Sequence, residues 1–332
     1  MSGHIPTLIH VGFGHSGTTS LQQNFFARHR DIFYCTSTGD HGGILSFIKY
    51  EEDWPAVERE VKAHCDKYIW RKIAPNQSLV LSDETLVEQP EVYYTPQMLP
   101  IAVIAQRLKQ LFPNARILFT LRNQLEYVVS CYLNLKRNYA YLANRCIEDF
   151  DTWFSGNHSQ IANLYLRNLD YSRAIAPFVN AFGKDAVAVL PLESLARLGH
   201  EAFLRRVGDP IGIETREDDV EDFRPIRNRR ISAFEDRILT RWRDPEVRSL
   251  YDSLAHALGP ARLRAWLDAG GPTSVALSDA QVATIRRRAG NGNRILAREF
   301  GLNLAGFGYP IQGEDGIRMR MRSAIAGVYA RA

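Results

Sequence analysis

The stretch GFGHSGTTSLQ, residues Gly12 to Gln22, decides the fold of this chain. It follows the apolar run Thr7–Phe13 and leads into a helix-like stretch at Thr19–Arg30. Glycines let a backbone curl so that successive N–H groups point inward, and the start of a helix adds unpaired donors. A strand, a glycine-rich loop and a helix in this order therefore predict a loop that binds a phosphate group.

The loop offers backbone N–H groups and hydroxyls as candidate anion ligands, from Gly14, His15, Ser16, Gly17, Thr18, Thr19 and Ser20. The alternative is an ordinary glycine-rich turn, which so many glycines and hydroxyls together disfavour. A loop that binds a nucleoside triphosphate has the form GxxxxGK[ST], and Thr18 stands where that lysine would be. Without the lysine, the loop suits a less charged group better than a triphosphate with magnesium.

Further short runs of β-branched and aliphatic residues predict strands at Ile32–Ser37, Ser78–Ser82, Ala115–Arg122 and Ala186–Leu192. Apolar residues at helical spacing predict a helix at Pro96–Phe112, and Leu125–Lys136 is a further helix-like stretch. Strands that alternate with helices indicate an α/β fold, a three-layer α/β/α arrangement around a central parallel sheet. The carboxyl ends of its strands would then meet at one edge, where ligands bind.

After about residue 215 the sequence becomes mostly helical and rich in arginine, without a clear linker. We expect one domain over residues 1–310 and a basic tail over 311–332. The composition, with 45% hydrophobic and 23% charged residues among 332, is typical of a soluble globular enzyme. A net charge of +4 suits an anionic ligand but is too small to indicate nucleic acid.

The cellular setting is inferred from features that the sequence lacks. The four cysteines show no metal-ligand spacing, which favours reduced thiols. Residues 1–12 show no secretion signal, and no apolar run reaches the roughly 18–20 residues of a membrane span. We therefore expect a cytoplasmic protein with a small-molecule or saccharide partner and neither nucleic acid nor membrane contact. A homo-oligomer is left open.

A second motif follows the predicted strand Ala115–Arg122. Arg122 ends that strand and Ser130 comes eight residues later, a little over two helical turns. If a helix begins after Arg122, the two side chains can converge on a second phosphate, because arginine offers a planar fork and serine another donor. Alone, this spacing is better explained by an exposed arginine and a helix-surface serine.

Together, HSGTTSLQ (15–22) and RNQLEYVVS (122–130) resemble the two phosphate motifs of the PAPS-dependent sulfotransferases, where PAPS is 3′-phosphoadenosine 5′-phosphosulfate. The sequence also resembles bacterial carbohydrate-type members at FGKDAVAVLPLESL (182–195) and NRILAREFG (293–301). The resemblance implies a P-loop-like fold in which the loop holds the 5′-phosphosulfate, and Arg122 and Ser130 hold the 3′-phosphate. It also implies PAPS as the sulfuryl donor, no required metal, and a carbohydrate or other polyhydroxylated acceptor. His15 stands where the family carries lysine, and we expect it to take the lysine's place.

Sulfuryl transfer needs a base for the proton of the acceptor and a positive group at the leaving oxygen. His41 lies in the loop STGDHGGILSF, a region where the resembled members carry a catalytic histidine or carboxylate. Glu84 lies directly after a predicted strand, with Asp83 beside it as a weaker candidate. The alternatives are a solvated histidine, and a helix N-cap at Ser82 or Asp83. A base elsewhere in the chain is also left open.

The basic stretch RPIRNRR (224–230) lies late in the chain, where the resembled family often has a loop that closes over the 3′-phosphate. The resemblance suggests Arg227 or Arg229 for that contact, and a solvated basic surface explains the stretch equally well. Two other functions compete with sulfuryl transfer. One is a nucleotide-binding protein without turnover, and the other is a P-loop kinase, which the missing lysine disfavours. The aromatic residues of segments 42–72 and 132–154 are candidate acceptor contacts or core residues: Phe47, Tyr50, Trp54, Tyr68, Trp70, Tyr132, Tyr139, Tyr141, Trp153 and Phe154.

Overall fold

A computed structural model of the chain describes residues 5–36, 42–87, 98–143, 146–155, 166, 168–223, 231–271, 273 and 275–312. Its centre is a parallel sheet of five strands in the order β2-β3-β1-β4-β5. The strands are β1 (Thr7–Gly12), β2 (Ile32–Thr36), β3 (Ser78–Ser82), β4 (Arg116–Leu121) and β5 (Val187–Pro191). All the predicted strands form, and each observed end lies within one residue of its predicted position.

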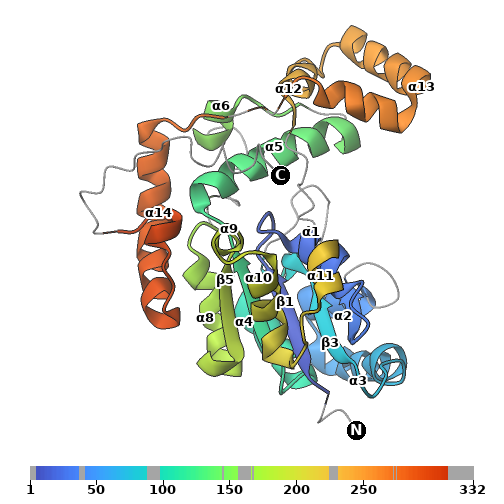
Figure 1. Ribbon diagram of the computed structural model, residues 1–332, viewed down its shortest axis with the longest axis vertical. Helices are drawn as coiled ribbons and strands as arrows, with labels where there is room; N and C mark the ends of the chain where they lie inside the picture. The colour runs from blue at the N-terminus through green and yellow to red at the C-terminus, as the bar shows by residue number, and fades with distance from the viewer. Residues whose placement is uncertain are drawn as a thin grey trace.

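Helices cover both faces of this sheet (Figure 1). Along β1, Ile9 and Val11 point into one core and Leu8 into the other, as alternation along a strand requires. The first core is covered by α2 (Gly42–Tyr50), α3 (Trp54–Cys65), α4 (Ile101–Leu111) and α8 (Tyr171–Phe182). The second is covered by η2 (Leu21–Phe26), α10 (His200–Gly208) and Phe223, which directly follows α11 (Glu217–Asp222). The predicted three-layer α/β/α architecture is therefore confirmed.

Three predicted helices form with different bounds. The stretch Thr19–Arg30 forms α1 (Thr18–Ser20), which continues into the wider π-helical turns of η2. Helix α4 begins only at Ile101, because Pro100 caps it with a carbonyl that accepts from Val103 N. Residues 96 and 97 lie outside the described part. Helix α5 spans Gln124–Ala143, so it is longer than predicted.

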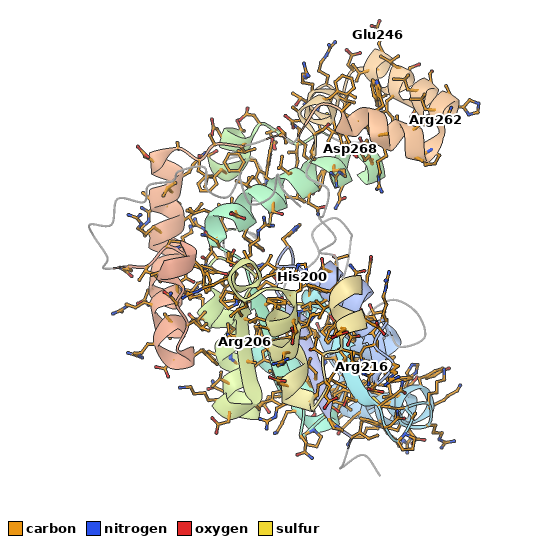
Figure 2. The ribbon with its side chains drawn as sticks, in the orientation of Figure 1. His200, Arg206, Arg216, Glu246, Arg262 and Asp268 are labelled. Carbon is orange, nitrogen blue, oxygen red and sulfur yellow. The ribbon has the colours of Figure 1, made fainter. Side chains whose placement is uncertain are left out.

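A third core lies beyond the edge of the sheet. It joins α5 to α6 (Phe150–Ser155), α12 (Ala233–Thr240), α13 (Pro245–Asp268) and α14 (Asp279–Phe300). Figure 1 shows α5 leaving the sheet and running towards α12 and α13, while α14 lies beside α8. Charged side chains of α13 such as Glu246 and Arg262 are exposed on the outer side of this group of helices (Figure 2). The mostly helical character predicted after residue 215 is thus confirmed.

Four of the candidate aromatic acceptor residues are core residues instead. Trp54 is buried in the first core, while Tyr132, Trp153 and Phe154 are buried in the core around α5. They pack there because large aromatic side chains bury more apolar surface than other residues. In the described part of the chain, no helix is both long and apolar enough to cross a bilayer.

Candidate functional site

The glycine-rich loop follows β1 and lies at the edge of the sheet where the strands have their carboxyl ends. Gly12 and Gly17 have φ angles of 101° and 84°, in the left-handed region that favours glycine. A Cβ on Gly12 would lie 3.0 Å from the Cα of Glu84, and a Cβ on Gly17 would lie 2.8 Å from Leu192 Cδ1. Gly12 is therefore required both by its φ and by the backbone of Glu84 packed against it, and Gly17 is required by its φ.

The two sequence motifs meet at His15. Arg122 Nη1 donates to the carbonyl oxygen of His15 at 3.1 Å, and Ser130 Oγ lies 3.4 Å from His15 Nδ1. Arg122 Nη2 also donates to Glu126 Oε2 at 3.2 Å, an ion pair along the first turn of α5. Glu126 and Ser130 are four apart and lie on one face of α5, and Arg122 precedes that helix by two residues. The structure thus brings the arginine and the serine of the second motif to the loop of the first.

The charge at this point comes from Arg122 and not from His15. Burial, with a smaller effect from the Arg122 charge, lowers the pKa of His15 from 6.5 to about 4. The imidazole is therefore neutral at pH 7 in the ligand-free protein. The Nε atom of Arg122 is buried and has no hydrogen-bond partner among the described residues. A buried unpaired donor costs stability, so this N–H fits an incoming anionic oxygen.

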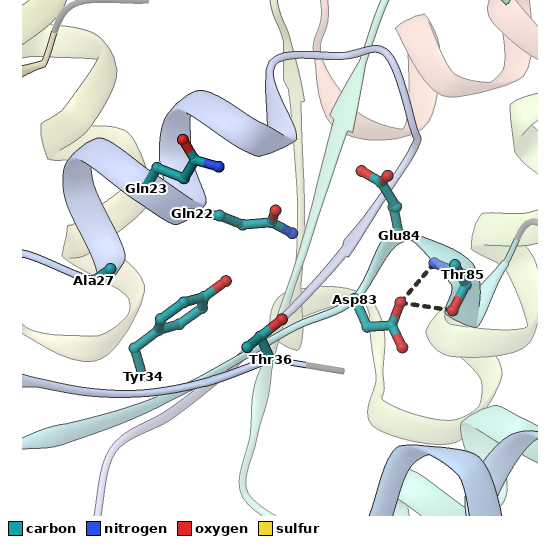
Figure 3. Close-up of a pocket in the computed structure, with 8 residues that line it drawn as sticks. All are labelled: Gln22, Gln23, Ala27, Tyr34, Thr36, Asp83, Glu84 and Thr85. Carbon is teal, nitrogen blue, oxygen red and sulfur yellow. Dashed lines mark hydrogen bonds between the residues drawn. The ribbon is translucent and has the colours of Figure 1, made fainter. Parts of the chain in front are cut away.

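Glu84 lies at the opposite side of the loop, after β3. Its Oε2 accepts a hydrogen bond from Thr18 Oγ1. Burial raises the pKa of Glu84, and the Asp83 charge adds to this, while the Thr18 hydroxyl acts in the opposite direction. Beside it is a pocket of about 360 Å³ (Figure 3). The pocket is lined by Gln22, Gln23, Ala27, Tyr34, Thr36, Asp83, Glu84 and Thr85.

Asp83 is engaged in a buried ion pair. Its Oδ2 accepts from Lys49 Nζ at 2.9 Å, and Lys49 Nζ also donates to Thr85 Oγ1 at 2.6 Å. Asp83 Oδ1 accepts from Thr85 N at 2.8 Å, so the predicted N-cap interpretation of this segment holds for Asp83. Asp83 is thereby held as a partner of Lys49, while Glu84, the other carboxylate that lines the pocket, has no ion pair among the described residues. Lys49 comes from α2, and no local pattern in the sequence marks it.

The hydroxyl of Ser16 is used inside the protein. Ser16 Oγ donates to the carbonyl oxygen of Phe13 and lies 2.8 Å from Thr120 Oγ1 on β4. A serine has a single proton to donate, so Ser16 must accept from Thr120. Any ligand contact of Ser16 would therefore be made by its backbone N–H. Gly14, Thr19 and Ser20 also belong to the predicted phosphate-binding loop.

A chain of hydrogen bonds runs under the loop from β3 to β4. Thr120 gives its only proton to Ser16, so it must accept from His10 Nε2, 3.1 Å away. His10 Nδ1 then accepts from Ser82 Oγ at 2.8 Å, and Ser82 Oγ accepts from Gln22 Nε2 at 3.0 Å. Burial lowers the pKa of His10 to about 3, so its ring is neutral and held in one tautomer.

Two of the predicted site residues, His41 and Arg229, lie outside the described residues, as does Arg227. The others lie together at one edge of the sheet, and their contacts with a ligand stay predictions. Within the described ranges, no cluster of three or more His, Cys, Asp or Glu side chains is placed to hold a metal ion. Sequence reasoning missed His10 and Lys49, because both act through partners that are distant along the chain.

No known family model and no curated protein matches the chain. Among solved structures, it is similar to a sulfotransferase from Alicyclobacillus acidocaldarius, with 19% identity over 79% of this chain and 95% of that one, and a TM-score of 0.46. It is also similar to the sulfotransferase domain of the curacin biosynthetic pathway, with 12% identity over 66% and 78% of the two chains and a TM-score of 0.41. Mouse sulfotransferase SULT7A1, solved with PAP, shares 11% identity over 84% and 88%, with a TM-score of 0.39. These likenesses are distant, so function is inferred from the residues at the sheet edge.

Proposed function

We propose that this protein transfers a sulfuryl group from PAPS to a hydroxyl of a carbohydrate or another polyhydroxylated small molecule, releasing 3′,5′-ADP. One observation carries the proposal. Arg122 and Ser130, more than a hundred residues beyond the glycine-rich loop along the chain, both contact His15 of that loop. Two neighbouring sets of anion-binding groups suit a nucleotide that carries separate 5′ and 3′ charged groups.

The residues of the site fit such a donor, although the loop lacks the lysine of triphosphate-binding loops. The loop N–H groups of residues 14–20 would hold the 5′-phosphosulfate, and the unpaired Nε of Arg122 with the Ser130 hydroxyl would hold the 3′-phosphate. Arg229 is proposed as a further 3′-phosphate ligand. When bound, PAPS supplies the sulfuryl group on a phosphate oxygen, so no metal is needed to generate it.

Glu84 is proposed as the base. Its carboxylate takes the proton of the acceptor hydroxyl while the hydroxyl oxygen bonds to sulfur and the bond from sulfur to the phosphate oxygen breaks. The electron pair stays on that phosphate oxygen, beside His15. Burial raises the pKa of Glu84, which makes its ionised form a stronger base. His41 stays the alternative base.

The pocket beside Glu84 supports a hydroxyl-rich acceptor. Its volume of about 360 Å³ lies at the small end of the usual range for ligand sites. Amide and hydroxyl groups of Gln22, Gln23, Tyr34 and Thr36 line it, and such groups can pair with the hydroxyls of a sugar. None of the described lining residues is a lysine or arginine, and Lys49 already pairs with Asp83, so an uncharged acceptor suits this wall better than an anionic one.

The first test is a thermal-shift comparison of 3′,5′-ADP, 5′-AMP and ATP, each with and without magnesium. We expect 3′,5′-ADP to stabilise the protein without magnesium, by about 2.7 kcal/mol at a hundred times its dissociation constant. Arg122→Ala should weaken 3′,5′-ADP about tenfold or more and 5′-AMP much less, because only the former carries a 3′-phosphate. Stronger stabilisation by ATP with magnesium would instead support a kinase.

The second test follows sulfuryl transfer directly. Sulfur-labelled PAPS is incubated with the protein and a panel of saccharides and other polyols, and labelled products are separated. Transfer to a hydroxyl acceptor is the expected result. Tight binding of 3′,5′-ADP without transfer or PAPS hydrolysis would support the nucleotide-binding protein without turnover.

A further inference from the structure

A single peptide group at the joint between β4 and α5 is held on both sides by side chains. The carbonyl oxygen of Arg122 accepts from the Tyr171 hydroxyl at 2.8 Å. The N–H of the same peptide belongs to Asn123 and donates to Glu193 Oε1 at 2.7 Å. Strand β4 ends just before this peptide and α5 begins just after it. Both polar atoms of the joint are therefore fixed by side chains from other elements.

Glu193 is itself held from the far end of the described chain. Its Oε2 accepts from the Tyr309 hydroxyl at 2.7 Å. Glu193 lies between β5 and α9 (Ser194–Leu198), whereas Tyr309 follows the short helix η7 (Ala305–Phe307). Tyr309 is 2% exposed and Tyr171 is fully buried, so water does not compete for these bonds. The carboxylate thus links the joint to a segment more than a hundred residues away.

The segment around Tyr309 contacts the joint at other points. Asn123 Nδ2 donates to the carbonyl oxygen of Phe307 at 3.3 Å. The carbonyl oxygen of Pro310 accepts from Asn293 Nδ2 at 2.8 Å, which ties the segment to α14. The backbone of residues 307–310 therefore accepts hydrogen bonds from Asn123 and from α14, in addition to the bond that the Tyr309 hydroxyl donates.

The position of this peptide fixes the place and direction in which the side chain of Arg122 leaves the backbone. Its guanidinium donates to His15 and to Glu126, and its Nε faces no protein acceptor in the described chain. Binding of a phosphate by an arginine fork depends on the direction of its N–H groups. A shift of the peptide that carries Arg122 would therefore misdirect the fork, while leaving the glycine-rich loop in place.

We propose that Tyr309, Glu193 and Tyr171 form a clamp that positions Arg122 for the 3′-phosphate of the donor. They are positioning residues, since they act through the Arg122–Asn123 peptide and do not reach the ligand. The clamp rests on the proposed function, because it assumes that Arg122 binds a 3′-phosphate. It makes selection of a 3′-phosphorylated nucleotide depend on the segment that carries Tyr309.

The test measures dissociation constants for 3′,5′-ADP and 5′-AMP by calorimetry on the full chain. The variants are Tyr309→Phe, Tyr171→Phe, Glu193→Ala and Glu193→Gln. Tyr132→Phe is the matched control, because it removes a buried tyrosine hydroxyl that donates to Glu148 O, away from the clamp.

We expect Tyr309→Phe, Tyr171→Phe and Glu193→Ala each to weaken 3′,5′-ADP by about threefold to tenfold, the range for loss of one hydrogen bond. Binding of 5′-AMP should stay within about twofold of wild type in each, as should both ligands in the control. Glu193→Gln should recover most of the 3′,5′-ADP affinity, because a glutamine can accept from Asn123 N and donate to Tyr309.

A general loss of folding would weaken both nucleotides together, so the ratio of the two dissociation constants is the deciding quantity. If Arg122→Ala abolishes the preference for 3′,5′-ADP while the tyrosine variants and Glu193→Ala retain it, the clamp is wrong and the proposed function stands. If the wild type itself shows no preference for 3′,5′-ADP over 5′-AMP, the proposed function is wrong, and the clamp falls with it. The two tyrosine variants remove one oxygen atom each, so they decide the outcome even if Glu193→Ala does not fold.

Discussion

His15 replaces a permanently charged lysine with a side chain whose charge depends on its surroundings. In the free protein its pKa is lowered to about 4, first by burial and then by Arg122. A bound phosphosulfate would act in the opposite direction, because a nearby negative charge favours the imidazolium. Raising the pKa to about 7 requires about 4 kcal/mol of interaction, which a doubly anionic ligand in a buried site can supply.

The first prediction is that turnover at saturating PAPS falls at alkaline pH. The physical reason is that His15 loses its proton there and no longer stabilises the leaving oxygen. His15→Lys should stay active and flatten this fall, whereas His15→Ala should lose rate more than it loses affinity for 3′,5′-ADP. The check is a pH–rate profile for each variant. An alanine variant with the turnover and profile of the wild type would show that the backbone N–H groups suffice.

The second prediction concerns stability of the ligand-free protein. Unfolded His15 has a pKa near 6.5 and folded His15 near 4, so the unfolded state binds the proton first as the pH falls. The stability that depends on neutral His15 is therefore complete above pH 6.5 and is lost between 6.5 and about 4. His15→Asn suits the comparison, because asparagine tolerates the φ of 60° at this position.

Urea unfolding of the wild type and of His15→Asn should be compared at pH 7.5 and pH 5. The free energy of unfolding should fall more steeply with acid in the wild type, since the variant lacks this titrating ring. Equal losses in both proteins would mean that His15 is not buried as described. The comparison cancels the other titrating groups, including Glu84 and Glu193, which both proteins share.

The third prediction separates the two candidate bases. Glu84→Gln should lower the transfer rate by about 10²–10⁴-fold, because the amide cannot take the acceptor proton. Its affinity for 3′,5′-ADP should stay close to wild type. Glu201→Gln is the control, an exposed carboxylate paired with Arg205 on α10. If His41→Ala loses the rate and Glu84→Gln keeps it, His41 is the base.

At the scale of elements, the strands were predictable and the polar network between them was not. Each strand is a short run rich in β-branched and aliphatic residues, so local pattern alone locates it. His10 lies inside such a run and looks like an interruption. Its partners, Ser82 and Thr120, are 72 and 110 residues away and meet it only because β3 and β4 flank β1.

Part of the candidate site was likewise predictable from the sequence, and part was not. The sequence marks the glycine-rich loop and the Arg122/Ser130 spacing, because a loop and a helical turn have local signatures. It does not mark Glu193 or Tyr309, since a carboxylate that binds a distant peptide N–H has no pattern along the chain. The hydroxyl of Ser16 was expected to face a ligand, but the strand beside it offers Thr120 as a partner instead.

The fourth prediction tests the hydrogen-bond chain between the strands. Ser82→Ala removes the donor to His10 Nδ1 and the acceptor for Gln22, so the buried ring of His10 and the half-buried amide of Gln22 each lose a partner. The free energy of unfolding should fall by about 1–3 kcal/mol. Nitrogen NMR of labelled histidine should show His10 as the Nε2–H tautomer in the wild type, and a different signal in the variant.

Ser78→Ala is the matched control, because Ser78 is a buried serine on the same strand whose hydroxyl donates to Ile211 O. It should leave the His10 signal unchanged. An Nδ1–H tautomer in the wild type would reverse the direction assigned to the chain.

At the scale of the whole molecule, a buried pair of amides joins the start of α5 to α14. Gln124 Nε2 donates to Asn293 Oδ1 at 2.8 Å, and Asn293 Nδ2 donates back to Gln124 Oε1 at 3.0 Å. Gln124 begins α5 and Asn293 lies in the middle of α14, and both are fully buried. The pair therefore fixes α14 against the start of α5, next to the peptide of Arg122.

The fifth prediction is that the two amides are strongly coupled. Asn293→Leu leaves buried polar atoms of Gln124 without their partner, so we expect a loss of about 1–3 kcal/mol in the free energy of unfolding. Gln124→Leu should cost a similar amount. The double variant should cost less than the sum, by about 0.5–3 kcal/mol, because it leaves neither amide facing an apolar partner. Asn291→Leu, at an exposed position on the same helix, controls for the change of residue type. Urea unfolding of the four variants gives the coupling energy. Strict additivity would mean that the two amides contribute independently, so that their mutual hydrogen bonds do not hold α14 against α5.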